Sequence, residues 1–411
     1  MRDRQLYAKI LDIQSPWTVD DVELDVSSKE VCVLLTPKSG TRFPCPLCNQ
    51  LCPGYDSQER RWRHLDTCNY RTILVARVPR VECPEHGVHA VKVPWAEPGS
   101  RFTALFEALA IDWLKEASIS AVAEHMGLSW DEADGIMQRA VKRGLERRGP
   151  TMPAHLGVDE KAFRRGHDYV TVVNDATTRT VVYVADGRKK ESLDGFFDAH
   201  EPDVKASVQS IAMDMWEPYI LSAREHIPDA DSKIAFDKFH VAKYLGEAVN
   251  SIRLQENKTL TKNDDERLKG TRYLWLMHPD KFSDEQWDDF EALRTSKLKT
   301  ARAWAIKEAA MELWDCSSRA GAEDAWRKWY GWAIRSRLEP MKSAARMVKR
   351  HLAGIITAAT TGVTNASAEG INSVIKLVQH TARGFRNRER FKSAIYFHLG
   401  GLDMYPQGVS L

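Results

Sequence analysis

The spacing of apolar positions changes along the 411-residue chain. Residues 1–100 contain short stretches in which apolar and polar side chains alternate, as in Val22–Val26, and Pro and Gly separate these stretches. A period of two predicts small strands joined by turns. Farther on, apolar residues recur at three- and four-residue spacing: Phe102, Leu105, Phe106, Leu109 and Trp113. This spacing predicts a helix with one apolar face.

Beyond Gly149-Pro150, a pair typical of a boundary, the pattern predicts alternating strands and helices. The predicted order is three strands, a helix, a strand, a helix and a strand. These elements cover His155–Asp159, Tyr169–Asp175, Thr180–Ala185, Ser192–His200, Val208–Asp214, Tyr219–His226 and Lys233–Asp237. The second and third strands are expected to form an antiparallel hairpin.

Residues 245–354 read as almost wholly helical, and Ala366–Val378 reads as a further helix. The first of these stretches contains seven of the thirteen tryptophans, at positions 275, 287, 304, 314, 326, 329 and 332. Tryptophan is a large and mostly buried residue, so we expect these side chains to form the core of a helical subdomain.

The overall composition is ordinary, whereas the number and positions of the cysteines suggest metal binding. With 43% hydrophobic and 28% charged residues the chain is typical of a globular protein, and it has no apolar run of 18 residues that would predict a membrane span. Its seven cysteines are odd in number, and Met1–Gln5 does not resemble the start of a secretory signal. We therefore expect a cytoplasmic protein, in which the five cysteines within residues 45–83 bind metal rather than form disulfides.

Two short motifs of matching form predict a zinc ribbon. They are Cys45-Pro46-Leu47-Cys48 and Cys83-Pro84-Glu85-His86. Tetrahedral Zn²⁺ requires four N or S donors, and turns of this kind deliver donors in pairs, so a structural zinc ion is expected. Cys52, Cys68 and His89 remain as substitute ligands. Between the motifs, Arg60, Arg61, Arg63 and His64 form either a phosphate-facing surface or a solvated one.

Residues Ile119–Ile136 fit a helix-turn-helix. Ala123 permits a close helix crossing, Gly127 suits the turn, and Ser129 can cap the second helix. Acidic residues at the start of that helix would repel DNA phosphate, however, and residues 101–150 hold seven basic against eight acidic side chains. A plain three-helix linker is an equal alternative on these residues alone.

Three carboxylates predict an active site. Asp159 closes the first strand after Pro150 and Asp214 closes the fourth, and in a sheet of this order those two strands are neighbours. Glu369 lies in a helical pattern that can bring its acid to the same edge. Gathered carboxylates raise one another's pKa, and divalent cations neutralise them. Two Mg²⁺ ions, or Mn²⁺, held at such a site suit in-line phosphoryl transfer.

Asp237 is the rival for the second acid, because it also ends a predicted strand. We favour Asp214 because the fourth strand adjoins the first. Asp237 and His240 are then expected beside the site, where they would position the substrate.

A basic region near the C-terminus favours a polyanionic substrate. The total charge is only +2, but residues 341–392 hold ten Lys and Arg against two acids. Arg383, Arg386 and Arg388 surround Phe385, as phosphate and base contacts require, and Lys376 lies two helical turns after Glu369. These four basic residues are the expected DNA contacts.

Taken together, the motifs closely resemble bacterial insertion-sequence transposases of the ISL-three family. The resemblance spans nearly the whole chain and rests on Gly157-Val158-Asp159-Glu160, Asp214-Met215, Asp237-Lys238-Phe239-His240 and Glu369-Gly370-Ile371-Asn372. It implies an RNase H-like core with Asp159, Asp214 and Glu369 as a DDE triad. It also implies zinc ligands at Cys45, Cys48 and Cys83, with His86 replacing a common fourth cysteine.

The resemblance also organises the domains. We expect a zinc ribbon over 1–100, a helix-turn-helix over 101–150, and a catalytic core over 151–244 and 355–411. An all-α insertion over 245–354 interrupts that core. The fold class is therefore multidomain α/β.

The expected function is DNA transposition. The N-terminal domains would recognise terminal inverted repeats in double-stranded DNA, and the core would cut the ends and join them to target DNA. Synapsis of two ends implies at least a homodimer, acting at the bacterial nucleoid and not in a membrane. Two alternatives remain open at this stage, namely a structure-selective nuclease that does not join ends and a zinc-dependent DNA-binding regulator.

Overall fold

The computed structural model describes residues 3–164, 166, 168–277, 279–316 and 318–409. The chain forms two compact units. One comprises residues 1–149 together with 402–411, and the other comprises residues 150–401. The five domain ranges expected from the sequence stay predictions, and each unit is described by itself below.

The first unit begins with α1 (Asp3–Ile10) and a sheet. Its main path runs in the order β1-β2-β6-β5, with β7 added to β6. The strands are β1 (Trp17–Asp25), β2 (Glu30–Pro37), β5 (Gly54–Thr67), β6 (Tyr70–Cys83) and β7 (Gly87–Ala90), and a small hairpin joins β3 (Phe43–Pro44) to β4 (Leu51–Cys52). Trp17 and Trp62 both pack edge-on against Trp95, with ring centroids 4.9 and 5.5 Å apart. The strands expected in this region are confirmed.

Three helices follow: α2 (Ala104–Glu116), α3 (Ile119–Met126) and α4 (Trp130–Arg148). Gly127 ends α3 in the left-handed conformation with φ of 65°, and Ser129 caps α4 in a capping box with Glu132. Ala123 and Ile136 are buried. The turn and cap predicted for the helix-turn-helix are therefore confirmed.

The predicted apolar face of α2 is wrong in part. Leu105, Leu109 and Trp113 are exposed, whereas Phe106 and the smaller positions around it are buried. Glu107, on the buried side, is 1% exposed because Arg139 and Arg143 of α4 pair with it. The inward face thus combines Phe106, Ile111 and Leu114 with alanines and an ion-paired acid, and it is rotated from the face that the spacing predicted.

After Gly401 the chain packs against these helices. The Arg143 guanidinium donates to the carbonyl of Met404, and Arg147 Nη1 donates to the carbonyl of Tyr405 at 2.7 Å. The Tyr405 hydroxyl donates to Asp112 of α2. Residues Leu402–Val409, called the C-terminal strap below, therefore complete the helical part of the first unit.

The second unit is built on a five-stranded mixed sheet in the order β10-β9-β8-β11-β12. Its strands are β8 (His155–Arg164), β9 (Asp168–Asp175), β10 (Thr180–Asp186), β11 (Ser210–Met213) and β12 (Ile234–Phe236). β8, β9 and β10 are antiparallel, whereas β8, β11 and β12 are parallel. The predicted neighbourhood of the first and fourth strands is confirmed, as is the hairpin.

One predicted strand boundary is wrong. β8 does not end at Asp159 but continues to Arg164, paired on one side with β9. The reason is the long antiparallel partner, whose hydrogen bonds carry β8 past the point where β11 stops.

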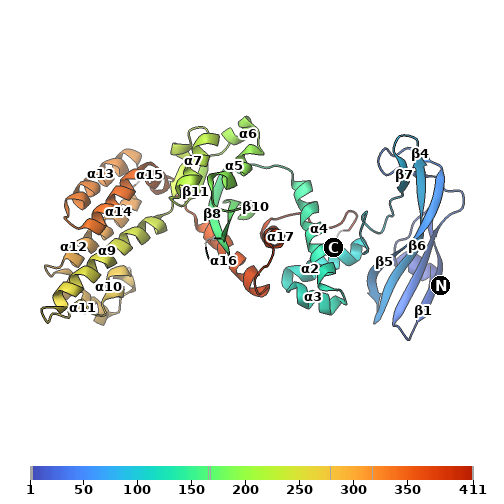
Figure 1. Ribbon diagram of the computed structural model, residues 1–411, viewed down its shortest axis with the longest axis horizontal. Coiled ribbons are helices and arrows are strands. Elements are labelled where there is room, and N and C mark those ends of the chain that lie inside the picture. The colour runs from blue at the N-terminus through green and yellow to red at the C-terminus, as the bar shows by residue number, and fades with distance from the viewer. Residues whose placement is uncertain (1–2, 165, 167, 278, 317, 410–411) are drawn as a thin grey trace. The chain divides into compact units, whose positions relative to one another are not determined.

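Helices cover this sheet and extend from it. They are α5 (Lys190–Asp198), α6 (Pro202–Ala206), α7 (Glu217–His226) and α8 (Ala230–Lys233), followed after β12 by α9 (Lys238–Thr261). A helical bundle continues through α10 (Arg272–Leu276), α11 (Asp284–Arg294), α12 (Lys299–Glu312), α13 (Arg319–Arg335) and α14 (Glu339–Arg350), as Figure 1 shows. The chain then returns to the sheet as α15 (Leu352–Thr361), α16 (Ala366–Thr381) and α17 (Arg388–Leu399).

Most tryptophans of the bundle are core residues, as predicted. Trp275, Trp304, Trp326 and Trp329 are buried and Trp314 is half-buried, whereas Trp287 and Trp332 are each 42% exposed. None of the helices in the part of the chain that the structure describes is both long enough and apolar enough to cross a bilayer.

Candidate active site and metal centres

Asp159 and Asp214 lie side by side at the edge of the second sheet. Val158 of β8 and Met213 of β11 are the last paired residues of these parallel strands, and each aspartate directly follows. Neighbouring strands are about 4.8 Å apart, so carboxylates at matching positions on the two strands can bind the same ion. One carboxylate oxygen each from Asp159, Glu160 and Asp214 lies within 4.8 Å of the others.

Glu160 is the member of this cluster that the sequence analysis did not select. Side chains alternate along a strand, so Glu160 would be expected on the face opposite Asp159. However, β11 ends at Met213 and leaves the edge of β8 open beyond Val158. Glu160 Oε1 accepts from Arg188 at 3.3 Å, while its Oε2 is buried and has no hydrogen-bond partner among the described residues. The adjacent acids in Asp159-Glu160 were the available signal.

His240 and Asp237 occupy different positions beside this cluster. His240 Nε2 lies 2.7 Å from Asp214 Oδ1, and this hydrogen bond raises the pKa of His240. Asp237 instead caps α9, accepting from the Phe239 amide at 2.6 Å, and its second oxygen accepts from the Asn365 amide at 3.1 Å. The carboxylate of Asp237 therefore holds two helix starts together, whereas that of Asp214 faces the cluster.

Glu369 is on α16, which runs beside β8 (Figure 1). Asn372, one turn farther on, donates to Asp159 Oδ2, and Lys161 Nζ donates to the Asn372 carbonyl at 3.0 Å. The Glu369 side chain itself is exposed and is not part of the cluster of three carboxylates. The structure thus brings the helix that bears Glu369 to Asp159 without including its carboxylate.

Burial and mutual repulsion keep protons on this edge. Burial, reinforced by the charge of Asp214, raises the pKa of Asp159 to about 7. The same two causes raise the pKa of Glu160. Ionising these neighbouring carboxylates together costs free energy, and a divalent cation would offset that cost. Carboxylate oxygens are the hard donors that such a cation prefers, and Glu160 Oε2, which is buried without a hydrogen-bond partner among the described residues, would supply one of them.

The four predicted zinc donors converge in the first unit. Ligand atoms of Cys45, Cys48, Cys83 and His86 all lie within 4.8 Å of one another. Zinc bonds are about 2.3 Å long to sulfur and about 2.05 Å to nitrogen. In a tetrahedral site these lengths place two sulfur donors about 3.8 Å apart and a sulfur and a nitrogen donor about 3.5 Å apart. The Cys48–Cys83 sulfur distance is 3.7 Å, and Cys83 Sγ lies 3.5 Å from His86 Nδ1. This donor set fits zinc, and the structure gathers none of the substitute ligands into it.

The basic residues predicted to contact DNA differ in their surroundings. Lys376, Arg383 and Arg386 are exposed. Arg388 pairs with Asp168 at 2.7 Å and lies over the Phe163 ring. In the zinc-ribbon region Arg60 and Arg61 are exposed, but His64 is turned inward and bonds to Thr103.

A mixed sheet in this strand order, with Asp159 inside its first strand and Asp214 directly after its fourth, is the RNase H-like core of a DDE transposase. Residues 156–395 match the transposase family ISL3. Residues 91–141 match the helix-turn-helix domain of that family, and residues 41–86 match the zinc-finger of transposases IS204/IS1001/IS1096/IS1165. The chain therefore belongs to the ISL3 family of insertion-sequence transposases.

Curated relatives support this assignment along the whole chain. The transposase for insertion sequence element IS1557 of Mycobacterium tuberculosis is 27% identical over 98% of this chain and 96% of its own length. The transposase for IS1001 of Bordetella parapertussis is 27% identical over 84% of this chain and 86% of its own. The protein is thus a DNA-binding transposase with a zinc ribbon, a helix-turn-helix and a DDE core.

Proposed function

We propose that this transposase binds the terminal inverted repeats of its own element, cuts the DNA at the element ends and joins the freed 3′ ends to target DNA. Asp159, Asp214 and Glu369 would hold two Mg²⁺ ions, with Mn²⁺ as a substitute. When bound, these ions would neutralise the acids and stabilise the oxygens that gain charge during phosphoryl transfer. The observation that carries the proposal is the pairing of Asp159 and Asp214 at one open sheet edge.

Glu369 is proposed to complete the site from α16. This helix is tied to the sheet through Lys161 and Asn372, one turn from Glu369, so a rotamer change or a small shift of α16 could move the carboxylate toward Asp159. Lys376, two turns from Glu369 on the same helix, would face the phosphates of DNA, and Arg383, Arg386 and Arg388 would extend that contact.

The partners follow from the reaction. Joining both ends of one element requires two active sites in one complex, so we infer at least a homodimer on DNA. The N-terminal domains would supply the sequence-specific contacts, and the complex would act in the bacterial cytoplasm, at the nucleoid.

The test is metal-dependent cutting of a labelled duplex that carries the element's own end, taken from the DNA bordering the coding region. Asp159→Asn, Asp214→Asn and Glu369→Gln should each lose cutting by at least about a hundredfold while binding the duplex normally. Wild-type-like cutting by Asp214→Asn together with loss in Asp237→Asn would assign the second acid to Asp237 instead. Cutting without any joining of pre-cleaved ends to target DNA would indicate a nuclease and refute strand transfer.

A further inference from the structure

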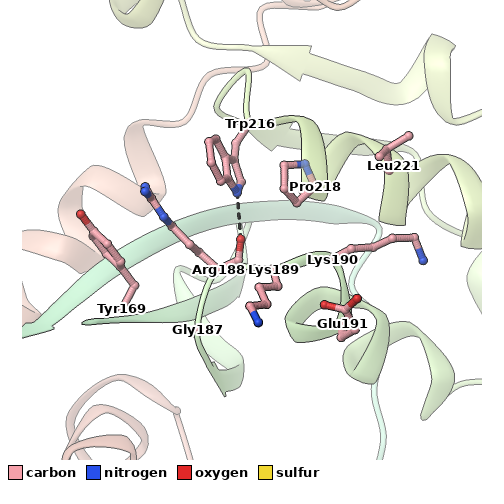
Figure 2. A pocket seen from close by; sticks show the side chains of 9 residues that line it. All are labelled: Tyr169, Gly187, Arg188, Lys189, Lys190, Glu191, Trp216, Pro218 and Leu221. Atoms are coloured by element: carbon pink, nitrogen blue, oxygen red, sulfur yellow. Dashed lines mark hydrogen bonds between the residues drawn. The ribbon is translucent and has the colours of Figure 1, made fainter. Parts of the chain in front are cut away.

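A pocket of about 540 Å³ lies beside the carboxylate edge, in the second unit. It is lined by Tyr169, Gly187, Arg188, Lys189, Lys190, Glu191, Trp216, Pro218 and Leu221 (Figure 2). Arg188 links the pocket to the site already described, because its guanidinium donates to Glu160. The volume is within the usual range of about 300–1,000 Å³ for small-ligand sites.

Two aromatic rings and one guanidinium form a fixed wall of this pocket. The Arg188 Cζ lies 4.3 Å from the Tyr169 ring centroid and 4.6 Å from that of Trp216, and Figure 2 shows its side chain between them. Trp216 Nε1 donates to the Arg188 carbonyl at 2.8 Å, and the Trp216 amide donates to the Asp214 carbonyl at 2.7 Å. The Trp216 backbone is therefore tied to the strand end that carries Asp214, and its indole is tied to the backbone of Arg188. A flat π-system is the natural ligand of such a wall.

The remaining lining favours an anion next to that flat group. The pocket is bordered by the first turn of α5, whose amide groups carry partial positive charge. The first turn of α7 adds little, because Pro218 has no amide N–H and the Tyr219 and Ile220 amides donate to the Trp216 carbonyl. Lys189 is exposed at its rim. Lys190 contributes less, because Asp194 and Glu225 pair with it at 2.8 and 2.7 Å. Glu191, an acid of the lining, is also exposed.

We propose that this pocket binds a single nucleotide of the DNA that has turned out of the duplex, with its base against Trp216 and its phosphate near Lys189. A nucleotide combines the flat ring and the anion that the lining favours. Trp216 lies two residues after Asp214, so the nucleotide would adjoin the phosphate that is cut. This inference rests on the proposed function and deepens it by adding an extrahelical nucleotide to the reacting DNA.

The test is a double-mutant cycle. It removes the Trp216 indole from the protein and one base from the DNA, first separately and then together. Cutting rates would be compared for wild type and Trp216→Ala on the intact end duplex and on duplexes that lack one base, at each position near the cut. On intact DNA, Trp216→Ala should slow cutting about 5- to 150-fold, the effect of losing one base–aromatic stack. At the position that enters the pocket, removal of the base should abolish most of this difference. Trp216→Phe should retain most activity.

Trp287→Ala is the matched control, because this tryptophan of the helical bundle is also partly exposed and should leave cutting unchanged on every duplex. An equal loss in Trp216→Ala at every abasic position would mean a structural role and would overturn the proposal.

A second readout does not depend on cutting. 2-Aminopurine at the same position should be quenched by wild-type protein and bright with Trp216→Ala, whereas equal fluorescence would overturn the pocket. Absence of cutting by wild type on all duplexes would count against the proposed function alone, because the fluorescence readout requires only binding.

Discussion

At the scale of single residues, the active edge gathers acids whose charges are only partly balanced. His240 contacts Asp214 and Arg188 contacts Glu160, so an imidazole and a guanidinium flank the three carboxylates. Glu160 is especially informative, because one of its oxygens is held by Arg188 and the other is buried without a partner among the described residues. Such an oxygen is stabilised when a cation reaches it.

We therefore predict that Glu160→Gln weakens the use of Mg²⁺. Glutamine keeps an acceptor for Arg188 but removes one negative charge from the edge. The Mg²⁺ concentration for half-maximal cutting should rise about 10- to 100-fold, with binding of end DNA unchanged. Asp203→Asn, at an exposed acid of α6 outside the site and the pocket, is the control and should behave as wild type. An unaltered Mg²⁺ dependence in Glu160→Gln would exclude it from the cation site.

The zinc centre allows a matched comparison of cysteines. Cys83 lies within the four-donor group, whereas Cys52 is buried nearby but bonds to the Gln50 carbonyl. Purified wild type should contain one zinc per chain by atomic absorption, Cys83→Ser should contain little, and Cys52→Ser should retain it. The first unit of Cys83→Ser should also lose stability, because zinc binding contributes to folding. If Cys52→Ser lost zinc and Cys83→Ser kept it, Cys52 would replace Cys83 as a zinc ligand.

His64 gives the first unit a predictable pH dependence. Burial, and then the charge of Arg63, lowers the pKa of His64 to about 4, whereas it is 6.5 in the unfolded chain. The neutral ring is therefore favoured by folding, so its contribution is full above pH 6.5 and is lost as the pH falls from 6.5 toward 4.

We predict that acid unfolding of the first unit is weakened in His64→Gln. Chemical denaturation between pH 7 and 4 should show a loss of stability in wild type that exceeds that of the variant by up to about 3 kcal/mol. Comparing the two proteins cancels the pH dependence of zinc binding. If the free energy of unfolding fell equally with pH in wild type and His64→Gln, His64 would not be buried as a neutral ring.

At the scale of elements, the end of β11 decides where chemistry can occur. β8 continues along β9 after β11 has stopped, and α16 crosses the open edge that results. Lys161, Asn372 and Asp237 fix α16 through contacts with its backbone, with Asp159 and with the amide of its capping residue Asn365. The helix that carries Glu369 is thus positioned by the same strand that carries Asp159.

The capping role of Asp237 leads to a prediction that separates it from Asp214. Asp237→Ala removes the cap of α9 and the acceptor for the Asn365 amide, so it should lower the free energy of unfolding of the second unit by about 1–2 kcal/mol. Asp237→Asn should stay close to wild type in thermal unfolding, because asparagine caps helices equally well. A catalytic defect in Asp237→Asn without a stability change would show that the Asp237 carboxylate acts in the reaction and is not only a cap.

At the scale of the whole molecule, the helical part of the first unit is built from two distant parts of the chain. Met404 of the C-terminal strap is buried, and Arg143 and Arg147 donate to its backbone carbonyls. Gly144 is required there, because a Cβ at this position would lie 2.6 Å from Leu402 Cβ. Basic side chains of α4 therefore hold the strap.

Removal of residues 402–411 should destabilise the first unit. Arg143 and Arg147 would lose their carbonyl partners, and the buried Met404 side chain would leave apolar surface exposed. In calorimetry of the full chain and the truncated chain, the transition of the first unit should move several degrees lower while that of the second unit stays in place. Tyr405→Phe, which removes only the hydroxyl contacts with Asp112 and Lys115, should give a smaller shift. An unchanged first transition would show that the strap does not stabilise the helices.

Features that depend on local pattern could be predicted from the amino-acid sequence. The period of apolar residues and the caps at Gly127 and Ser129 predicted elements, and paired Cys and His motifs predicted the zinc donors. The order of strands and helices along the chain predicted that the first and fourth strands are neighbours, which placed Asp159 beside Asp214. Helices, caps and paired metal ligands are predictable because they depend on residues only a few positions apart.

The packing of distant segments fixed the surroundings of several side chains, which no local pattern revealed. The length of β8 depends on β9, and the gap left by β11 turns Glu160 toward the acids, so neither was visible in a single strand. The burial of Glu107 on α2 depends on its ion pairs with Arg139 and Arg143. Burial and ion pairing are set by partners far along the chain, and a local pattern does not contain that information.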